Sequence, residues 1–224
     1  MTKSKMPTEE RILSAAAGLF ALKGYEGTTT REIVKEANAS LSSMQLYFGS
    51  KEGVYKAVLD KTMAAFAKKT ETMIGEIDKV EKLGLLNKGS SWDMIVSLTD
   101  AVIEWAFNKD YAVEIMLIQK ELMQPSPFFK PMPESVKALY QYYEKLFRVY
   151  ASADDSEDWV KGLSFTIVTT IFAFANMPQA MEEVIGKPLS DPDTIISAKV
   201  RLKRYLLTGL RPYLNFHREE KEEE

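Results

Sequence analysis

The sequence predicts an all-α fold in which a small three-helix domain at the N-terminus is followed by a larger helical domain. Apolar residues recur along the chain at intervals of three and four, which is the spacing of a helix face. No segment alternates with period two, as a half-buried strand would. The 224 residues are 46% hydrophobic and 27% charged, which suffices for one sizeable core and a small appended domain.

Capping residues divide the first 50 residues into three short helices. The first is predicted to begin at a Thr8 cap and to end at Gly24. Thr29 begins the second helix, because it stands three residues before Glu32 in the spacing of a capping box. This second helix is only about two turns long.

The third short helix begins at Ser40, another capping residue, and ends at Gly49. Asn38 lies in the turn before it, because asparagine tolerates the left-handed backbone that a tight turn needs. Two short helices joined by such a turn form a helix-turn-helix. In this motif the second helix presents its outer face to base edges in the major groove of DNA.

The side chains of this reading helix divide into an inner and an outer set. Met44 and Phe48 are predicted to face the core, so Leu41, Ser42 and Gln45 share the outer face. Gln45 is the best candidate to read sequence, since a glutamine amide can pair with adenine through two hydrogen bonds. Leu41 is placed to contact a thymine methyl group.

Hydroxyl and cationic side chains on either side of the outer face are placed to bind phosphates. Arg31 is placed to reach either a phosphate or a guanine. The predicted DNA-binding residues are Thr29, Thr30, Arg31, Ser40, Leu41, Ser42, Ser43, Gln45, Tyr47 and Lys51. Residues 1–70 carry 11 Lys/Arg against 7 Asp/Glu, whereas the remainder carries 18 against 25, which suits a polyanionic partner for the N-terminal part alone.

The stretch ERILSAAAGLFALKGYEGTTTREIVKEANASLSSMQLYFGSKEGVY resembles the DNA-binding domain of the TetR family of transcriptional regulators, over about residues 8–60. The matching landmarks are Ile12, Leu13, Ala16, Leu19, Phe20, Gly24, Thr29, Thr30, Ile33, Ala37, Ser40, Tyr47, Phe48, Ser50, Lys51 and Glu52. The resemblance implies base contacts from the outer face of the reading helix. It also implies phosphate contacts from Thr30, Ser43, Tyr47 and Lys51, and a regulator that is more commonly a repressor. Asn38 stands where the family usually has glycine, so the turn requires Asn38 to adopt the left-handed conformation.

The rest of the chain is also predicted to be helical. We expect a DNA-binding domain over residues 1–50, a connecting helix over 51–83, a ligand-binding and dimerisation domain over 84–216, and a disordered acidic tail over 217–224. Within the large domain the expected helices span residues 92–108, 111–124, 134–150, 157–177 and 193–210. The segment KELMQPSPFFKPMPES is similar to a stretch in the CecR-like subgroup of the TetR family, although it is short enough to be only a loop between helices.

An aromatic and Met-rich set in the large domain could line an apolar pocket for a small-molecule effector that is itself largely apolar or aromatic. The alternative is that these residues simply pack in the core. The candidates are Trp105, Met116, Phe128, Phe129, Tyr140, Tyr143, Phe165 and Phe172.

The helix over 163–177 is apolar nearly all round, so one side needs a partner chain once the other packs on its own domain. The TetR resemblance implies that this helix and the last one form a four-helix bundle across a two-fold axis in a homodimer. The alternative is a wholly intramolecular core. The candidate interface residues are Gly162, Phe165, Thr169, Ala173, Ile196, Val200 and Leu207.

The composition speaks against most enzyme classes. With no cysteine and one histidine, thiolate zinc sites, cysteine nucleophiles and histidine-based triads are nearly excluded, so we predict no catalytic residue, metal or cofactor. Two alternatives remain: a helical protein-interaction module without DNA binding, and an all-α enzyme using carboxylates such as Glu114 and Glu121. The most apolar run, residues 162–177, is shorter than the roughly 20 residues that span a bilayer, and no secretory signal is seen, which predicts a cytoplasmic protein.

Overall fold

The computed structural model describes residues 6–129, 133–151 and 157–222, and all regular structure in these ranges is helical, which confirms the predicted all-α fold. The chain divides into two compact units. The unit called here the head consists of Met1–Lys68 and Asp110–Ser135, and the unit called the body consists of Lys69–Lys109 and Val136–Glu224. The segment Asp110–Ser135, expected in the large domain, therefore belongs to the head.

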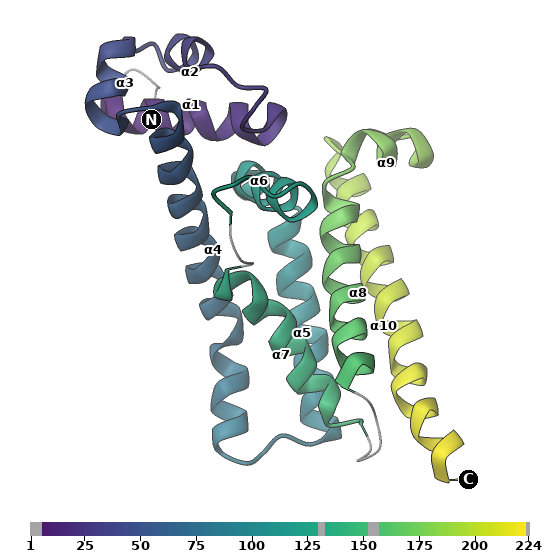
Figure 1. Cartoon of the computed structure of the whole chain (residues 1–224). Coiled ribbons are helices and arrows are strands. Elements are labelled where there is room, and N and C mark those ends of the chain that lie inside the picture. The colour runs from purple at the N-terminus through teal and green to yellow at the C-terminus, as the bar shows by residue number, and fades with distance from the viewer. Residues whose placement is uncertain (1–5, 130–132, 152–156, 223–224) are drawn as a thin grey trace. The chain divides into compact units, whose positions relative to one another are not determined.

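The head contains α1 (Thr8–Lys23), α2 (Thr30–Glu36), α3 (Leu41–Phe48), the first part of α4 (Lys51–Lys82) and α6 (Ala112–Met123), as Figure 1 shows. The first three helices pack on one another, and α6 packs on α1. The buried core of the head is formed by Ile12, Ala16, Phe20, Ala21, Ile33, Ala37, Met44, Val54, Tyr55, Val58, Leu59, Leu117 and Phe129.

Local polar contacts explain where the short helices of the head begin and end. The Thr29 hydroxyl accepts a hydrogen bond from the Glu32 amide at 3.2 Å, and the Glu32 carboxylate accepts one from the Thr29 amide at 2.8 Å, which is the predicted capping box. Gly24 ends α1 with a φ of 73°. The predicted Thr8 cap is wrong, because α1 includes Thr8 and its N-cap position is Pro7, which makes no side-chain cap.

The body contains the second part of α4 and α5 (Lys88–Ala106), α7 (Glu134–Arg148), α8 (Glu157–Ala175), α9 (Pro178–Ile185) and α10 (Pro192–Glu222). The helices α8 and α10 both pack on α5. Two buried hydrogen bonds join α5 to α7, because the Ser91 hydroxyl donates to the Leu146 carbonyl oxygen at 2.6 Å and the Thr99 and Tyr143 hydroxyls lie 3.0 Å apart. A short 3-10 helix, Lys109–Tyr111, lies where the chain passes from the body to the head.

Several helix ends in the body differ from the prediction. Helix α5 begins four residues before the expected Trp92, because the Asn87 side chain accepts hydrogen bonds from the Gly89 and Ser90 amides and caps it. After the helix expected over 157–177, Pro178 begins the separate helix α9, because proline at the first helical position loses no intrahelical hydrogen bond.

The last helix starts at Pro192, one residue before the expected start at 193, and the carboxylate of Asp191 accepts a hydrogen bond from the Thr194 amide at 3.0 Å. It also passes Pro212 and the expected end at residue 210. Residues 217–222 of the expected disordered tail are therefore helical, and residues 223–224 lie outside the described ranges.

Candidate nucleic-acid interface

The outer face of α3 is open to solvent. Leu41, Ser42 and Gln45 are all exposed, whereas Met44 is buried in the head core. This division between faces is the one that the helical spacing predicts. The α3 helix therefore presents an amide, a hydroxyl and an apolar side chain together on one surface.

Leu46 belongs to the same outer face and is missing from the predicted site. Its side chain is 81% exposed, more than any other large apolar residue of α3. Its spacing of four from Ser42 was the signal that places it there. Two exposed leucines thus flank Ser42 and Gln45, and methyl groups of thymine are the base atoms that apolar side chains contact.

The hydroxyl groups at the helix starts are engaged with the backbone. The Ser40 side chain accepts a hydrogen bond from the Ser43 amide at 3.0 Å, and the two serine hydroxyls lie 2.8 Å apart. Thr29 is engaged in the same way with Glu32. Thr29 and Ser40, predicted among the DNA-binding residues, therefore cap α2 and α3, and Ser43 lies half-buried beside its cap.

Cationic and aromatic groups lie near the start of α4. The Lys51 ammonium lies 4.1 Å from the centroid of the Tyr25 ring, a cation–π contact that restrains a half-buried side chain. Burial, and then the charge of Glu52, raise the pKa of Tyr25. Tyr47 and Arg31 are exposed, and Thr30 is half-buried in the first turn of α2. The predicted phosphate-binding residues thus come from α2, α3 and α4.

One carboxylate in this region is held in its charged form. Glu32 accepts a hydrogen bond from the Lys23 ammonium at 2.6 Å and further hydrogen bonds from Thr29. These contacts lower the pKa of Glu32 to about 2, the Lys23 hydrogen bond being the largest cause. The capping box is therefore intact across the neutral and mildly acidic range.

Two adjacent residues of α6, Lys120 and Glu121, join this helix to α1 and α4 in the head. The Lys120 ammonium donates to the carbonyl oxygens of Ala21 and Leu22, at 3.3 and 2.9 Å, near the C-terminus of α1. The Glu121 carboxylate is 2% exposed and accepts hydrogen bonds from the Tyr55 hydroxyl and from the Ser126 amide and hydroxyl. Burial, and then this carboxylate, raise the pKa of Tyr55.

These contacts bear on the carboxylate-enzyme alternative. Glu121 is satisfied by three donors within the head, and Glu114 is half-buried in the first turn of the same helix. Within the described ranges no group of three or more histidine or acidic side chains is arranged to hold a metal ion. Glu121 thus has a structural task that accounts for its burial.

The predicted effector-binding residues are divided between the two units. Met116, Phe128 and Phe129 pack in or against the head core. In the body, Trp105 lies edge-on to Phe172, with ring centroids 5.6 Å apart, and Tyr143 is buried beside Phe147. Tyr140 stacks on Phe165, which is 57% exposed. The eight residues therefore do not form one cluster, and those of the body lie on α5, α7 and α8.

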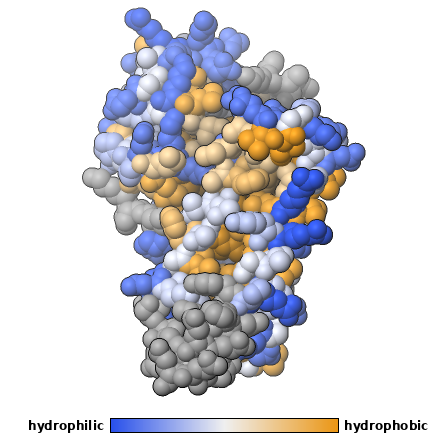
Figure 2. Space-filling model, turned by 90° about the vertical axis from the view of Figure 1, so that its right-hand side faces the viewer, coloured by the Kyte–Doolittle hydropathy of each residue, from blue (hydrophilic) through white to orange (hydrophobic). Residues whose placement is uncertain are grey.

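The predicted dimer residues lie on exposed stripes of two helices of the body. Gly162, Phe165 and Thr169 are exposed on α8, and Ile196 and Val200 are exposed on α10. Ala173 and Leu207 are half-buried. Figure 2 shows the side of the molecule that carries α8 and α10, with apolar residues gathered between hydrophilic ones.

By length and composition alone, residues Asp158–Ala175 of α8 could cross a membrane. The core helices of soluble proteins often have the same length and composition, so this is weak evidence for a membrane span.

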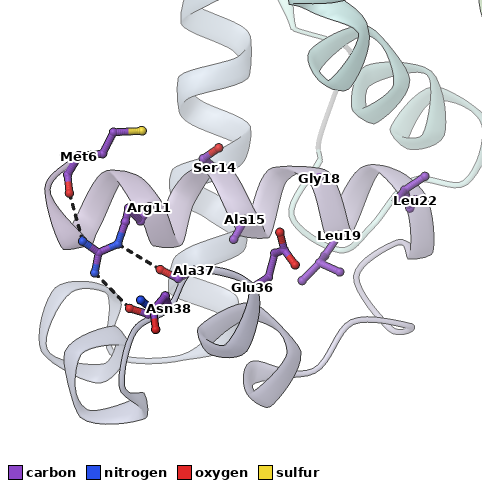
Figure 3. Close-up of a pocket in the computed structure, with 10 residues that line it drawn as sticks. All are labelled: Met6, Arg11, Ser14, Ala15, Gly18, Leu19, Leu22, Glu36, Ala37 and Asn38. Carbon is purple, nitrogen blue, oxygen red and sulfur yellow. Dashed lines mark hydrogen bonds between the residues drawn. The ribbon is translucent and has the colours of Figure 1, made fainter. Parts of the chain in front are cut away.

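A cavity of about 630 Å³ lies between α1 and the end of α2 (Figure 3). Its walls include Ser14, Ala15, Gly18 and Leu22 from α1. Arg11 borders it and reaches across to the carbonyl groups of Ala37 and Asn38. This cavity lies in the head, on α1 and the end of α2 rather than on the reading helix α3.

The geometry of the head agrees with comparisons to known proteins. Residues 12–58 match the family described as bacterial regulatory proteins of the tetR family. The chain is 32% identical over 73 residues to the probable HTH-type transcriptional regulator YttP of Bacillus subtilis, a match that covers 33% of this chain and 35% of that protein. Residues 12–58 of this chain thus resemble the DNA-binding part of TetR family regulators. The curated relatives that it matches are covered over only about a third of their own length.

Solved structures of TetR family regulators share the fold over nearly the whole chain. A regulatory protein from Rhodococcus RHA1 has a TM-score of 0.62 and 19% identity, over 91% of this chain and 97% of that one. FadR from Bacillus subtilis, solved in complex with stearoyl-CoA, has a TM-score of 0.57 and 16% identity, over 90% and 99% of the two chains. The chain thus shares the all-helical fold of these solved regulators, with a head and a body.

Proposed function

We propose that this TetR family protein is a ligand-responsive repressor that binds a palindromic DNA operator as a homodimer and is released by a small-molecule effector. The observation that carries the proposal is the outer face of α3, where Leu41, Ser42, Gln45 and Leu46 are all exposed on a helix anchored by buried Met44. An exposed, rigid helix with an amide at its centre is suited to the major groove.

Each side chain of the interface takes a distinct role in this proposal. Gln45 pairs with an adenine, while Leu41 and Leu46 contact thymine methyl groups. Tyr47, Lys51 and the hydroxyls near the starts of α2 and α3 contact phosphates on either side of the groove. Base contacts set the sequence, and phosphate contacts set register and most of the affinity.

The homodimer is proposed to form through α8 and α10. Phe165, Ile196 and Val200 expose large apolar surfaces on these helices, and all three lie on the body. Such a surface loses contact with water when a second copy covers it, and a two-fold axis makes the same patch serve both partners. A two-fold dimer places its reading helices about 34 Å apart, which matches successive major grooves and a palindromic site.

The effector is proposed to bind in the body and to be largely apolar or aromatic. The candidate residues Trp105, Tyr140, Tyr143 and Phe172 lie on α5, α7 and α8, where Trp105, Tyr143 and Phe172 are buried. FadR, which shares the fold, was solved with an acyl-CoA, and this supports a search among long apolar ligands first. An effector that favours a dimer whose heads are misplaced weakens operator binding by the same coupling energy, typically about 1–3 kcal/mol. Repression follows when the bound dimer excludes other proteins from the same DNA. A DNA-binding regulator of this kind acts in the cytoplasm, where the DNA is.

Selection of DNA from a random pool tests this proposal. The purified protein is mixed with random duplexes at low salt, and bound molecules are sequenced after several rounds. We expect an enriched palindrome with half-sites about 10 base pairs apart. The bound duplex is then challenged with a panel of acyl-CoAs, fatty acids and aromatic acids, and at least one compound should release it. Absence of any enriched sequence would overturn DNA reading, whereas enrichment of a single unpaired half-site would overturn the dimer.

A further inference from the structure

The guanidinium of Arg11, in the first turn of α1, donates four hydrogen bonds within the head. Its Nε donates to the Ala37 carbonyl oxygen at 3.1 Å, and its Nη2 donates to the Asn38 carbonyl oxygen at 3.2 Å. The same group donates to the Thr8 hydroxyl at 3.3 Å and to the Met6 carbonyl oxygen at 3.2 Å. A guanidinium has five N–H donors, so these contacts leave no pair of donors for a phosphate.

The two carbonyl groups that Arg11 contacts lie at the turn between α2 and α3 (Figure 3). The Ala39 amide donates to the Val34 carbonyl oxygen, and the Asn38 amide donates to the Lys35 carbonyl oxygen. This pair of hydrogen bonds is the Schellman motif, which ends a helix where the residue after the C-cap is left-handed. Asn38 takes this conformation with a φ of 48°. The carbonyls of Ala37 and Asn38 lie beyond these bonds, and Arg11 supplies their donors.

This contact has a mechanical consequence for the reading helix. The α3 helix begins at Leu41, three residues after Asn38, so any rotation at the turn redirects its whole outer face. The positive charge of Arg11 also lies at the C-terminus of α2, where the helix dipole favours a cation. Arg11 thus holds the turn from α1, a helix outside the helix-turn-helix pair.

We propose that Arg11 is a positioning residue for DNA recognition, which fixes the turn between α2 and α3, and with it the orientation of α3, without contacting DNA itself. The proposal rests on the proposed function, since it concerns how α3 is aimed. Its chemistry requires the planar fork of a guanidinium, because an ammonium cannot reach both carbonyl groups in the same geometry.

Three variants separate positioning from charge. Arg11→Lys keeps the charge and loses the fork, and Arg11→Gln loses both. Lys35→Gln removes an equal charge from an exposed site in the last turn of α2 and leaves the Arg11 contacts in place. Each is measured for affinity to the duplex selected by the wild-type protein and to a random duplex, over a range of salt concentrations.

We expect Arg11→Lys and Arg11→Gln to weaken binding to the selected duplex roughly tenfold, the loss of about one charge-assisted hydrogen bond. Random-duplex affinity and the salt slope should be unchanged, and Lys35→Gln should change neither affinity by more than about twofold. The proposal fails if Arg11→Lys binds the selected duplex like the wild type. It also fails if Arg11→Gln lowers the salt slope by about 0.9 more than Lys35→Gln does, because that is the signature of a lost phosphate contact.

Amide hydrogen exchange tests the same contact without DNA. In Arg11→Lys the Ala39 amide should exchange roughly tenfold faster, while the amide of Ala16, in the middle of α1, stays at the wild-type rate. Equal acceleration at both positions would indicate general destabilisation and would overturn the positioning role, as would an unchanged Ala39. If the wild-type protein binds no duplex, DNA reading fails, and the exchange rates alone then decide whether Arg11 holds the turn.

Discussion

Two exposed surfaces within the described part of the chain, one on α3 and one on α8 and α10, differ in chemistry. On α3 the exposed residues mix an amide and a hydroxyl with two leucines, and the backbone ends nearby are capped by Thr29 and Ser40. On α8 and α10 the exposed residues include Phe165, Ile196 and Val200. The first surface suits a polar, charged polymer with methyl groups in its groove, and the second suits another copy of the same helices. In our proposal, these two surfaces recognise DNA and a second copy of the chain, respectively.

Breaking the apolar surface should have the largest effect. Phe165→Asp places a charge on the face that the proposed dimer would bury, so we expect monomers in sedimentation analysis. Because the two heads then bind DNA independently, affinity for the selected palindrome should fall by about 10²–10⁴. Val184→Asp is the matched control, because Val184 is 87% exposed on α9, outside this face. A Phe165→Asp protein that remains dimeric would contradict the proposed interface.

Substitutions on α3 and α4 should separate residues that contact bases from residues that contact phosphates. Gln45→Ala should cost about 1–3 kcal/mol on the selected duplex and little on random DNA, because it removes a base contact. Lys51→Ala should weaken both duplexes alike and lower the salt slope by about 0.9, because it removes a phosphate contact. Fluorescence anisotropy at several salt concentrations measures both. An equal loss on both duplexes from Gln45→Ala would refute its reading role.

The buried contact between α4 and α6 in the head can be tested through its tyrosine. Tyr55→Phe removes a donor to the buried Glu121 carboxylate, which should cost about 1–3 kcal/mol in urea unfolding at neutral pH. Because burial raises the pKa of Tyr55 above its ordinary value near 10, the contribution of Tyr55 to the free energy of unfolding should be constant below pH 10 and should be lost as pH rises beyond it. The phenylalanine variant should fall less steeply above pH 10. Tyr205→Phe is the control at an exposed position, and an identical alkaline profile for wild type and Tyr55→Phe would contradict the account.

The smallest effect is expected at the capping box. Thr29→Ala should destabilise the head by about 1 kcal/mol, because it leaves an amide of α2 without its side-chain acceptor.

The contacts of Glu32 make the stability of the head depend on pH. The pKa of Glu32 is lowered to about 2, so the stabilisation from these contacts is present above the unfolded pKa near 4.5 and is lost as pH falls from there toward 2. Acid titration of unfolding in wild type and Lys23→Met checks this, since the variant should lose less stability over that range. Matching acid profiles would show that the Lys23 contact does not matter.

Short-range chemistry made most of the head predictable. The pair Thr29 and Glu32, the Ser40 cap and the left-handed Asn38 each act within a few residues, so spacing alone revealed them. Leu46 is absent from the predicted DNA-binding residues, although its spacing of four from Ser42 places it on the exposed face.

Contacts between residues far apart in the chain could not be predicted from the sequence. The contact between Tyr55 and Glu121 joins residues 66 positions apart, and the contacts of Lys120 with α1 join residues almost 100 positions apart. No local sequence pattern therefore indicates that α6 belongs to the head. Asn87 caps α5 and Pro178 begins α9, and asparagine and proline are also common in loops, so residue type alone does not fix these helix starts.

Cross-linking from α3 tests the central claim most directly. Because the chain has no cysteine, Ser42→Cys carries a unique site for a short photoreactive group, and Val184→Cys carries the matched site on α9. With the selected duplex, Ser42→Cys should cross-link to bases at two symmetric positions about 10 base pairs apart, and Val184→Cys should give none. Cross-links from Ser42→Cys that are absent, or that fall at random along the duplex, would contradict the assignment of α3 as the reading helix.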